Sequence, residues 1–481
     1  MSSSNGLGNG GSLNSFDGLY KGFLGGGSNE ELKRHVAQNG LSPEQYTTVL
    51  KDLRHGLQWT NGAYDFLKTT EDSPKLPFLQ LAVLVYDQLT EEDKLDILVL
   101  VSQYLNPWVP WSNVKLATEA AKLQPEYEKL ALPFLEKIRP SLLSIPNVKV
   151  SSSGYRRTGL GASGLRPSLG FSGIGSSIFE DDKRKEWKTS QNITALSTVY
   201  GFLAVPDDSL DFQANWPIAI TFILNVLDDS DPVFRAQGCH LVERVLNTGH
   251  EKVLIRSGHV DLFLESTESC LHYLPSLTPA DVSLHLLSAA YPLLYRLMEL
   301  REKPISSYTA VLEKNILSSI SHVQGRESEN GANRVLTFLL KQAENLIRQR
   351  LGGAVLGGFS RLNYTLCQLI TNPFLIDADG GAEVVDSALS VQNASVEAFK
   401  EAQDKQGREL FGSHKYDLLG SWIVLLRRVE KFKVGTKSTK GVIVENIRGL
   451  SDIVGPELQQ DYEAALESSP GTLPTWDDLL K

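Results

Sequence analysis

The sequence predicts an all-α fold in which helical hairpins pack side by side in an extended array. Apolar residues recur at helical spacing in one segment after another, most of them about 11 to 20 residues long. The breaks between these segments are short, as expected of packed helical hairpins, and only brief runs such as GVIVENI have an ambiguous strand pattern. A chain of 481 residues accommodates either several domains or one array of small repeating units.

The N-terminal part combines a flexible start with a helical region. Gly, Ser and Asn dominate residues 1–28, and this composition predicts a disordered arm. Helical structure is expected over residues 29–148, because Ser28 and Glu31 form a capping-box pattern ahead of an amphipathic segment. The arm is therefore expected to end where this first helix begins.

Two further start signals support the helical region. Ser42 stands before Pro43, with Gln45 placed to reach back, and apolar residues follow at helical spacing. Thr90 precedes Asp93 in the same way at the start of a later apolar segment. Each signal predicts the first turn of a helix.

The remaining chain divides by composition into three parts. Residues 149–186 are rich in Ser and Gly and are predicted to form a disordered linker. Residues 187–469 return to helical periodicity and are predicted to be the main repeat region, in which Pro217 is expected to start one helix. Residues 470–481 form a short acidic-aromatic tail.

Charge and cysteine content limit the classes of function. Lys and Arg number 47 against 57 Asp and Glu, so the formal charge of −10 argues against broad attraction to nucleic acid or anionic membranes. The apolar stretches are too short and too interrupted to cross a bilayer. Only three cysteines occur, widely spaced, which fits a reducing compartment, and we expect the protein in the cytoplasm and the nucleus.

An acidic cluster between two apolar segments is the most informative local feature. Asp228, Asp229 and Asp231 are followed by Pro232, so the cluster either binds a cation or turns the chain between two helices. The turn is favoured because Asp231 is placed as a helix N-cap and Pro232 as the first helical residue. The oxygen-rich set of ligands that a metal needs is not visible in the sequence.

Two residues downstream complete this structural turn. Asp228 and Asp229 would lie at the C-terminal end of the preceding helix, where negative charge is unfavourable without a cation, and Arg235 is close enough to supply one. Gly238 would let the two helices approach closely. The order Asp-Pro, then Val, Arg and a small residue, resembles the second helix of a HEAT-type repeat, which implies helix pairs stacked as an α-solenoid.

A more specific resemblance appears between residues 185 and 300. EWKTS, ITFILNVLDDSDPVFRAQGCHLVERVL, VLIRSGHVDLFLESTESCLHYLP and SAAYPLLYRLMEL are together similar to the Tel-two-interacting protein two family, a subunit of the Triple-T co-chaperone complex. The resemblance implies a non-catalytic scaffold that binds sister Triple-T subunits and supports the maturation and stability of phosphatidylinositol-3-kinase-related kinases. Contacts with those kinases and with the heat-shock chaperone machinery would be indirect.

Sequence motifs for catalysis are absent. The chain has no HExxH, paired CxxC, GxSxG or Walker motif, so we expect neither a metal nor a cofactor, and no enzymatic activity. Two alternatives stay open at this point. An enzyme could assemble its site across repeats, as catalytic triads do from distant residues, or the chain could be a nuclear transport or RNA-binding helical adaptor.

Two segments near the C-terminus are candidate partner-binding sites. The first is basic, and it either binds an acidic protein or RNA or is simply a solvated helix end. The second is the tail, which either docks into a partner groove or folds back to cap the array. The candidate residues are Arg427, Arg428, Lys431 and Lys433 in the basic segment and Trp476, Asp477, Asp478, Leu479 and Leu480 in the tail.

Overall fold

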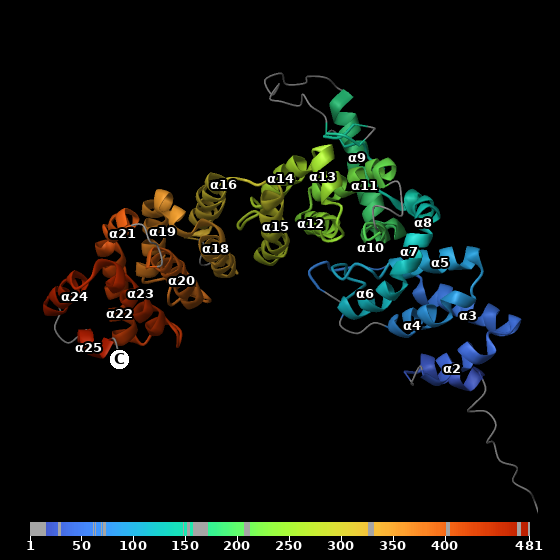
Figure 1. Cartoon of the computed structure of the whole chain (residues 1–481), viewed down its shortest axis with the longest axis horizontal. Coiled ribbons are helices and arrows are strands. Elements are labelled where there is room, and N and C mark those ends of the chain that lie inside the picture. The colour runs from blue at the N-terminus through green and yellow to red at the C-terminus, as the bar shows by residue number, and fades with distance from the viewer. Residues whose placement is uncertain are drawn as a thin grey trace, which may run out of the picture. The chain divides into compact units, whose positions relative to one another are not determined.

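A computed structural model shows the all-α fold that the sequence predicts (Figure 1). It describes residues 16–26, 30–60, 62, 64–68, 70, 74–147, 149–151, 154–156, 172–205, 212–325, 331–400, 405–468 and 473–479. Within these residues the only extended pairing is a single bridge between Val150 and Arg156. None of the described helices combines the length and the apolar character that crossing a bilayer requires.

The helices form two compact units, one that ends at Ser266 and one that begins at Thr267. The helices of the first unit are α1 (Phe16–Leu24), α2 (Glu30–Asn39), α3 (Pro43–Leu57), α4 (Leu76–Val85), α5 (Glu91–Ser102), α6 (Val114–Ala120), α7 (Gln124–Lys129), α8 (Ala131–Ile138), α9 (Ser172–Thr189), α10 (Ala195–Phe202), α11 (Phe212–Leu227), α12 (Pro232–Asn247), α13 (Glu251–Ser257) and α14 (His259–Cys270), the last of which runs past the boundary. Short 3-10 turns accompany them: η1 (Tyr86–Gln88), η2 (Ala121–Leu123), η3 (Arg139–Ser141) and η4 (Gln191–Thr194).

The first unit is built from neighbouring helices that pack in succession. Helix α3 packs against α4 and α5, α5 contacts α8 and α10, and α10 contacts α12, along which α11 lies. Two of the predicted helix-start signals form helix caps in this unit. The hydroxyl of Ser42 accepts the Gln45 N–H at 3.3 Å while the Gln45 side chain accepts the Ser42 N–H at 2.8 Å, which closes a capping box. Thr90 caps α5 by accepting the Asp93 N–H, whereas Ser28 lies outside the described residues.

The second unit is a two-layer stack. Its elements are α15 (Ala280–Leu300), α16 (Ile305–Ala310), the π-helix η6 (Val311–Leu317), α17 (Ser318–Val323), α18 (Ala332–Leu346), the π-helix η7 (Ile347–Leu351), the 3-10 segment η8 (Gly352–Gly358), α19 (Phe359–Thr371), α20 (Gly381–Lys400), α21 (Lys405–Gly412), α22 (Lys415–Phe432), α23 (Thr439–Val454), α24 (Glu457–Glu467) and α25 (Trp476–Leu479). Helices α15, α18, α20 and α23 contact one another in that order and form one layer. Helices α17, α19 and α22 pack on α18, α20 and α23 respectively and form the other layer, as in a solenoid.

A short aromatic helix occupies part of the segment predicted as a disordered arm. Helix α1 buries Phe16, Tyr20 and Phe23, and the Tyr20 hydroxyl donates to Asp52 at 2.8 Å. These aromatic residues recur at helical spacing among glycines, so the apolar pattern outweighs the composition that favours a flexible chain.

The end of the predicted linker is also helical. Helix α9 begins at Ser172 and continues through Thr189, and it buries Trp187, whose indole N–H donates to the Ser141 carbonyl at 2.8 Å. The charged half of this helix gains order from tertiary contacts that the local composition does not reveal. Residues 157–171 of the linker lie outside the described part of the chain.

Two local features of the sequence are helical in ways that their patterns do not specify. Helix α11 starts at Phe212, so Pro217 lies inside it and does not begin it. A proline inside a helix removes one backbone donor and crowds the carbonyl four residues earlier, and the burial of neighbouring residues such as Trp216 and Ile220 outweighs that cost. The ambiguous run at residues 441–447 is part of helix α23.

Candidate functional site

The acidic turn joins helices α11 and α12, and Asp231 begins the second of them. Asp231 is the N-cap residue with extended dihedral angles, and its carboxylate accepts the Val233 N–H at 3.0 Å. Pro232 follows as the first helical residue, where its missing N–H costs nothing. The carboxylate of Asp231 is thus committed to the helix end.

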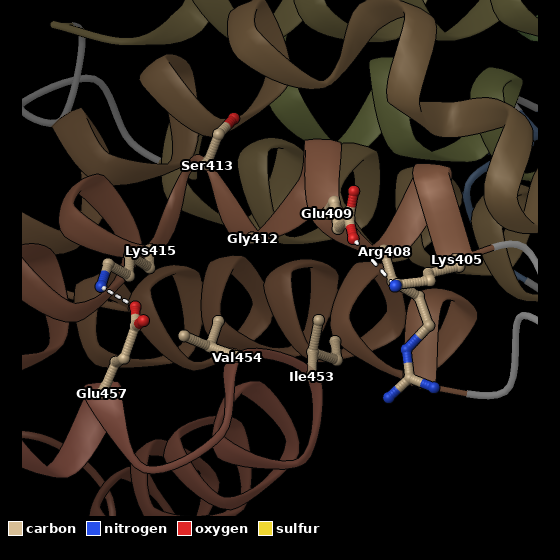
Figure 2. A pocket seen from close by; sticks show the side chains of 9 residues that line it. All are labelled: Lys405, Arg408, Glu409, Gly412, Ser413, Lys415, Ile453, Val454 and Glu457. Carbon is tan, nitrogen blue, oxygen red and sulfur yellow. Dashed lines mark hydrogen bonds and ion pairs between the residues drawn. The ribbon is translucent and has the colours of Figure 1, made fainter.

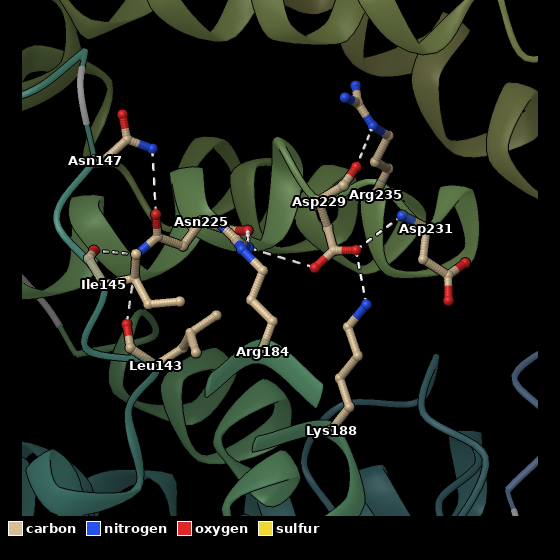
Figure 3. Close-up of polar contacts among 9 residues, drawn as sticks. All are labelled: Leu143, Ile145, Asn147, Arg184, Lys188, Asn225, Asp229, Asp231 and Arg235. Atoms are coloured by element: carbon tan, nitrogen blue, oxygen red, sulfur yellow. Dashed lines mark hydrogen bonds and ion pairs between the residues drawn. The ribbon is translucent and has the colours of Figure 1, made fainter. Parts of the chain in front are cut away.

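Asp229 is the buried centre of the turn (Figure 3). Only 2% of its side chain is exposed, and Lys188 and Arg184 of helix α9 place their cationic groups 2.7 and 3.4 Å from its carboxylate oxygens. The same carboxylate accepts the Asp231 N–H at 2.8 Å. A buried carboxylate needs such partners, because burying an unpaired charge is very costly.

Arg235 acts on the backbone of the turn. Its Nε–H donates to the Asp229 carbonyl at 2.6 Å, so it stabilises the C-terminal end of α11 as a cation is expected to. The cations paired with the two carboxylates in the described contacts come from elsewhere: Lys188 and Arg184 for Asp229, and Lys149 at 2.8 Å for Asp228. The sequence alone does not identify these three residues as partners of the turn.

The turn also fixes the segment that precedes the linker. The Asn225 amide donates to the Ile145 carbonyl at 2.6 Å, and Arg184 donates to the Asn225 carbonyl at 2.7 Å (Figure 3). Lys149 bridges Asp228 and the Ser266 hydroxyl, each at 2.8 Å. One polar network therefore ties together α9, α11, α14 and the chain after η3. Arg184 and Lys188 lie four residues apart and so share one face of α9, but nothing in their spacing connects them to Asp229.

Gly238 sets the approach of α11 to α12. A Cβ atom at this position would lie 2.5 Å from the Cα and 2.6 Å from the backbone N of Leu227. Real Cβ atoms do not come that close to backbone, so only glycine fits without a shift of the helices. The predicted turn residues therefore meet in one place and position two packed helices.

An aromatic pocket of about 580 Å³ lies beside the turn. Trp59, Tyr64 and Phe66 border it from the segment after α3, and Phe234 borders it from the first turn of α12. The Lys188 ammonium stands 4.2 Å from the centre of the Phe234 ring. Aromatic-lined pockets of this kind favour apolar groups of a ligand or partner. Among the described residues there is no group of three or more potential metal ligands.

The basic segment is held mostly by contacts within the chain. Arg427 and Arg428 donate to the backbone carbonyls of Ala465 and Thr371. Lys433 and Lys440 pair with Glu430, and the hydrogen bond from Lys440 is the main reason that the pKa of Glu430 is lowered. Lys431 and Lys433 keep exposed side chains, with Lys431 stacked over its neighbour Phe432.

The tail lies against the last long helix of the second unit. Trp476 packs edge-on against Tyr462 of α24 with 5.4 Å between ring centres, and the Tyr462 hydroxyl donates to the Pro474 carbonyl at 2.9 Å. Leu479 is buried, whereas Asp477 and Asp478 are exposed. This is the folded-back arrangement of the two that the sequence leaves open. Leu480 lies outside the described residues.

Comparison with known proteins identifies a family. A sequence model of the Tti2 family matches residues 97–377, more than half of the chain. The match includes all four segments between residues 185 and 300 that carry the resemblance and extends well beyond them on both sides. Neither the curated proteins nor the solved structures contain a match.

Proposed function

The chain belongs to the Tti2 family, and we propose on this basis that it is a non-catalytic scaffold subunit of a Triple-T-like co-chaperone complex. In that complex it would support the maturation and stability of phosphatidylinositol-3-kinase-related kinases. The family match over residues 97–377 carries the proposal, and the stacked helical hairpins agree with it. We place this work in the cytoplasm and the nucleus.

The proposed mechanism is binding by a largely preformed helical surface. Sister Triple-T subunits would bind this surface directly, and the kinases and heat-shock chaperones would be reached through them. Preformed surfaces of stacked helices suit this role, because little ordering is needed when the partner binds. The Asp229 turn would shape the surface and would perform no chemistry.

The C-terminal candidates would contribute exposed charges to this surface. We assign partner contact to Lys431, Lys433, Asp477 and Asp478, whose side chains are exposed. Arg427, Arg428, Trp476 and Leu479 would hold these groups in place through their contacts within the chain. Leu480, at the end of the tail, is assigned to the same contact surface.

Affinity purification of the full-length protein from its native source tests the proposal. Mass spectrometry and sizing should recover two other large helical subunits in stoichiometric amounts, with kinases and chaperones in lower amounts. Recovery of a monomer that carries a small ligand would contradict the scaffold and favour an enzyme. Stoichiometric RNA that is lost steeply with salt would instead favour the nucleic-acid adaptor.

A charge reversal connects the turn to this assembly. Arg235→Glu removes the cation that stabilises the Asp229 carbonyl and places a carboxylate at the negative end of α11. We expect reduced recovery of the sister subunits or a reduced yield of folded protein. Lys252→Glu on the exposed face of α13 is the matched control and should leave both unchanged. Full recovery of the sister subunits with Arg235→Glu would show that the turn does not contribute to the assembly surface.

A further inference from the structure

A groove with an apolar floor lies between α21 and the end of α23, outside the residues that the family model matches (Figure 2). Its volume is about 580 Å³. Ile453 and Val454 form the floor, and both remain partly exposed although they belong to a packed helix. Gly412 of α21 lies over Val454, and a Cβ atom there would be in ordinary van der Waals contact with its Cγ2 at 3.6 Å.

At one end of the groove, the cationic side chain is already paired with two carboxylates. The Lys415 ammonium lies 2.8 Å from Asp461 and 3.2 Å from Glu457, and 13% of the Lys415 side chain is exposed. These hydrogen bonds raise the pKa of Lys415, led by the bond to Asp461. A lysine that already has two carboxylates offers little attraction to a further anion.

The other end presents cations whose pairing is weak. Arg408 donates one Nη2–H to the Asp452 carbonyl at 3.0 Å, which is its one hydrogen bond to protein among the described residues. A guanidinium has five N–H donors in a planar fork that matches a carboxylate, so the described residues leave most of this fork unoccupied. Lys405 is 3.7 Å from Glu409, and the two side chains are 90% and 69% exposed, a geometry that contributes little binding energy.

The carboxylates nearest to Arg408 already have lysine partners, and Glu409 is beside Lys405. The carboxylate of Asp452 is paired with Lys400 at 2.7 Å. Figure 2 shows Ile453 and Val454 between the Lys415–Glu457 pair at one end and Lys405, Glu409 and Arg408 at the other. Apolar contact area and an available guanidinium are thus adjacent within one groove, on a chain whose formal charge is −10.

From this arrangement we propose that the groove binds a short acidic–apolar segment of a protein partner. An apolar side chain of the segment would cover Ile453 and Val454, and a neighbouring carboxylate would accept two hydrogen bonds from Arg408 with Lys405 beside it. Because the chain as a whole has a formal charge of −10, the cations of the groove would give the bound segment its orientation and specificity. The groove is a second contact surface, separate from the Asp229 turn.

Fluorescence anisotropy with the purified full-length chain and three labelled peptides of equal length tests the groove. The first peptide carries Asp and Leu residues, the second replaces every Leu by Ser, and the third replaces every Asp by Lys. We expect the first peptide to bind and the other two to bind at least about tenfold more weakly, because each lacks one of the two contacts. Equal binding of the serine peptide would overturn the proposal, since only an ionic patch would then remain.

Reciprocal charge reversal separates a lost contact from a lost fold. Arg408→Glu should weaken the acidic–apolar peptide by about tenfold or more and should strengthen the lysine peptide. Lys341→Glu on the exposed face of α18 is the matched control and should change neither. An unchanged affinity of the acidic peptide for Arg408→Glu would reject the groove as its binding site. Displacement of that peptide by single-stranded RNA, with the same dependence on Arg408, would reject a protein segment as the occupant.

The groove and the Triple-T scaffold can fail independently. Recovery of sister subunits with Arg408→Glu reports on the assembly, and peptide anisotropy reports on the groove. Intact assembly together with lost peptide binding is the result expected if the groove serves a partner other than the sister subunits.

Discussion

Lys188 on helix α9 places its ammonium 2.7 Å from the buried carboxylate of Asp229 in the α11–α12 turn. The residues are 41 positions apart, and the pair joins helix α9 to the turn between α11 and α12. Because only 2% of the Asp229 side chain is exposed, its charge depends on these partners for stabilisation.

Asp229→Asn should lower the free energy of unfolding by about 3 kcal/mol, because Arg184 and Lys188 would lose their buried anion. Chemical denaturation measures this loss. Lys188→Gln alone should cost less, since Arg184 would still pair with Asp229, and the double variant should be about 0.5–3 kcal/mol more stable than the sum of the single losses predicts. Strict additivity of the two losses would mean that the pair contributes nothing.

Gly238→Ala should destabilise the first unit by about 1–3 kcal/mol, because the new methyl group would press on the backbone of Leu227 and separate α11 from α12. The matched control is Gly420→Ala, an exposed helical glycine in α22 whose Cβ would meet nothing within 4 Å. The control should gain up to about 1 kcal/mol, since alanine favours helices over glycine. Urea unfolding of both variants gives the comparison, and equal shifts would show that the close approach is unimportant.

The predictable parts of the fold are those specified by local chemistry. The capping box at Ser42 and the N-caps at Thr90 and Asp231 follow from residues within three positions, so the sequence alone places the corresponding helix starts. The all-α class follows likewise from apolar periodicity. Helices α1 and α9 were not predicted, because tertiary burial of Phe16, Tyr20 and Trp187 decides their order while the glycine and serine around them favour a flexible chain.

Only those residues of the candidate site that act on nearby parts of the chain can be predicted from the sequence. Asp231, Pro232 and Gly238 act on their sequence neighbours or on the preceding helix, and their roles can be inferred from spacing. The cations paired with Asp228 and Asp229 come from about 40 to 80 residues away, and no periodic pattern connects such positions. The fold-back of Trp476 onto Tyr462 likewise depends on packing that the spacing of residues does not reveal.

His259 should make the first unit sensitive to mild acid. The Trp216 indole N–H donates to His259 Nδ1 at 3.0 Å, and since an indole only donates, this nitrogen is unprotonated and the ring is neutral. Burial lowers the pKa of His259 from 6.5 to about 4. The folded-state pKa lies below the unfolded value, so the stability that His259 contributes is fully present above pH 6.5 and is lost as the pH falls through about 4.

Thermal unfolding followed by tryptophan fluorescence between pH 7 and pH 4 measures this effect. His259→Gln removes the titrating group, so its melting temperature should start lower at pH 7 and decline less steeply towards pH 4. Trp216→Phe identifies the indole that reports the change. Parallel pH profiles for the wild type and His259→Gln would assign the acid sensitivity to other groups.

Trp476→Ala should loosen the C-terminal end of the second unit. The indole packs edge-on against Tyr462, whose side chain is fully buried, and burial raises the pKa of that phenol to about 12. Removing the indole should cost about 1–3 kcal/mol and should move the Tyr462 pKa back towards 10, which ultraviolet absorbance at alkaline pH detects. Asp477→Asn changes only an exposed charge and should leave both quantities unchanged while it weakens partner capture, if the exposed acids of the tail contact the partner. Lost capture with an unchanged Tyr462 pKa in Trp476→Ala would mean that the indole contacts the partner and does not cap the helical stack.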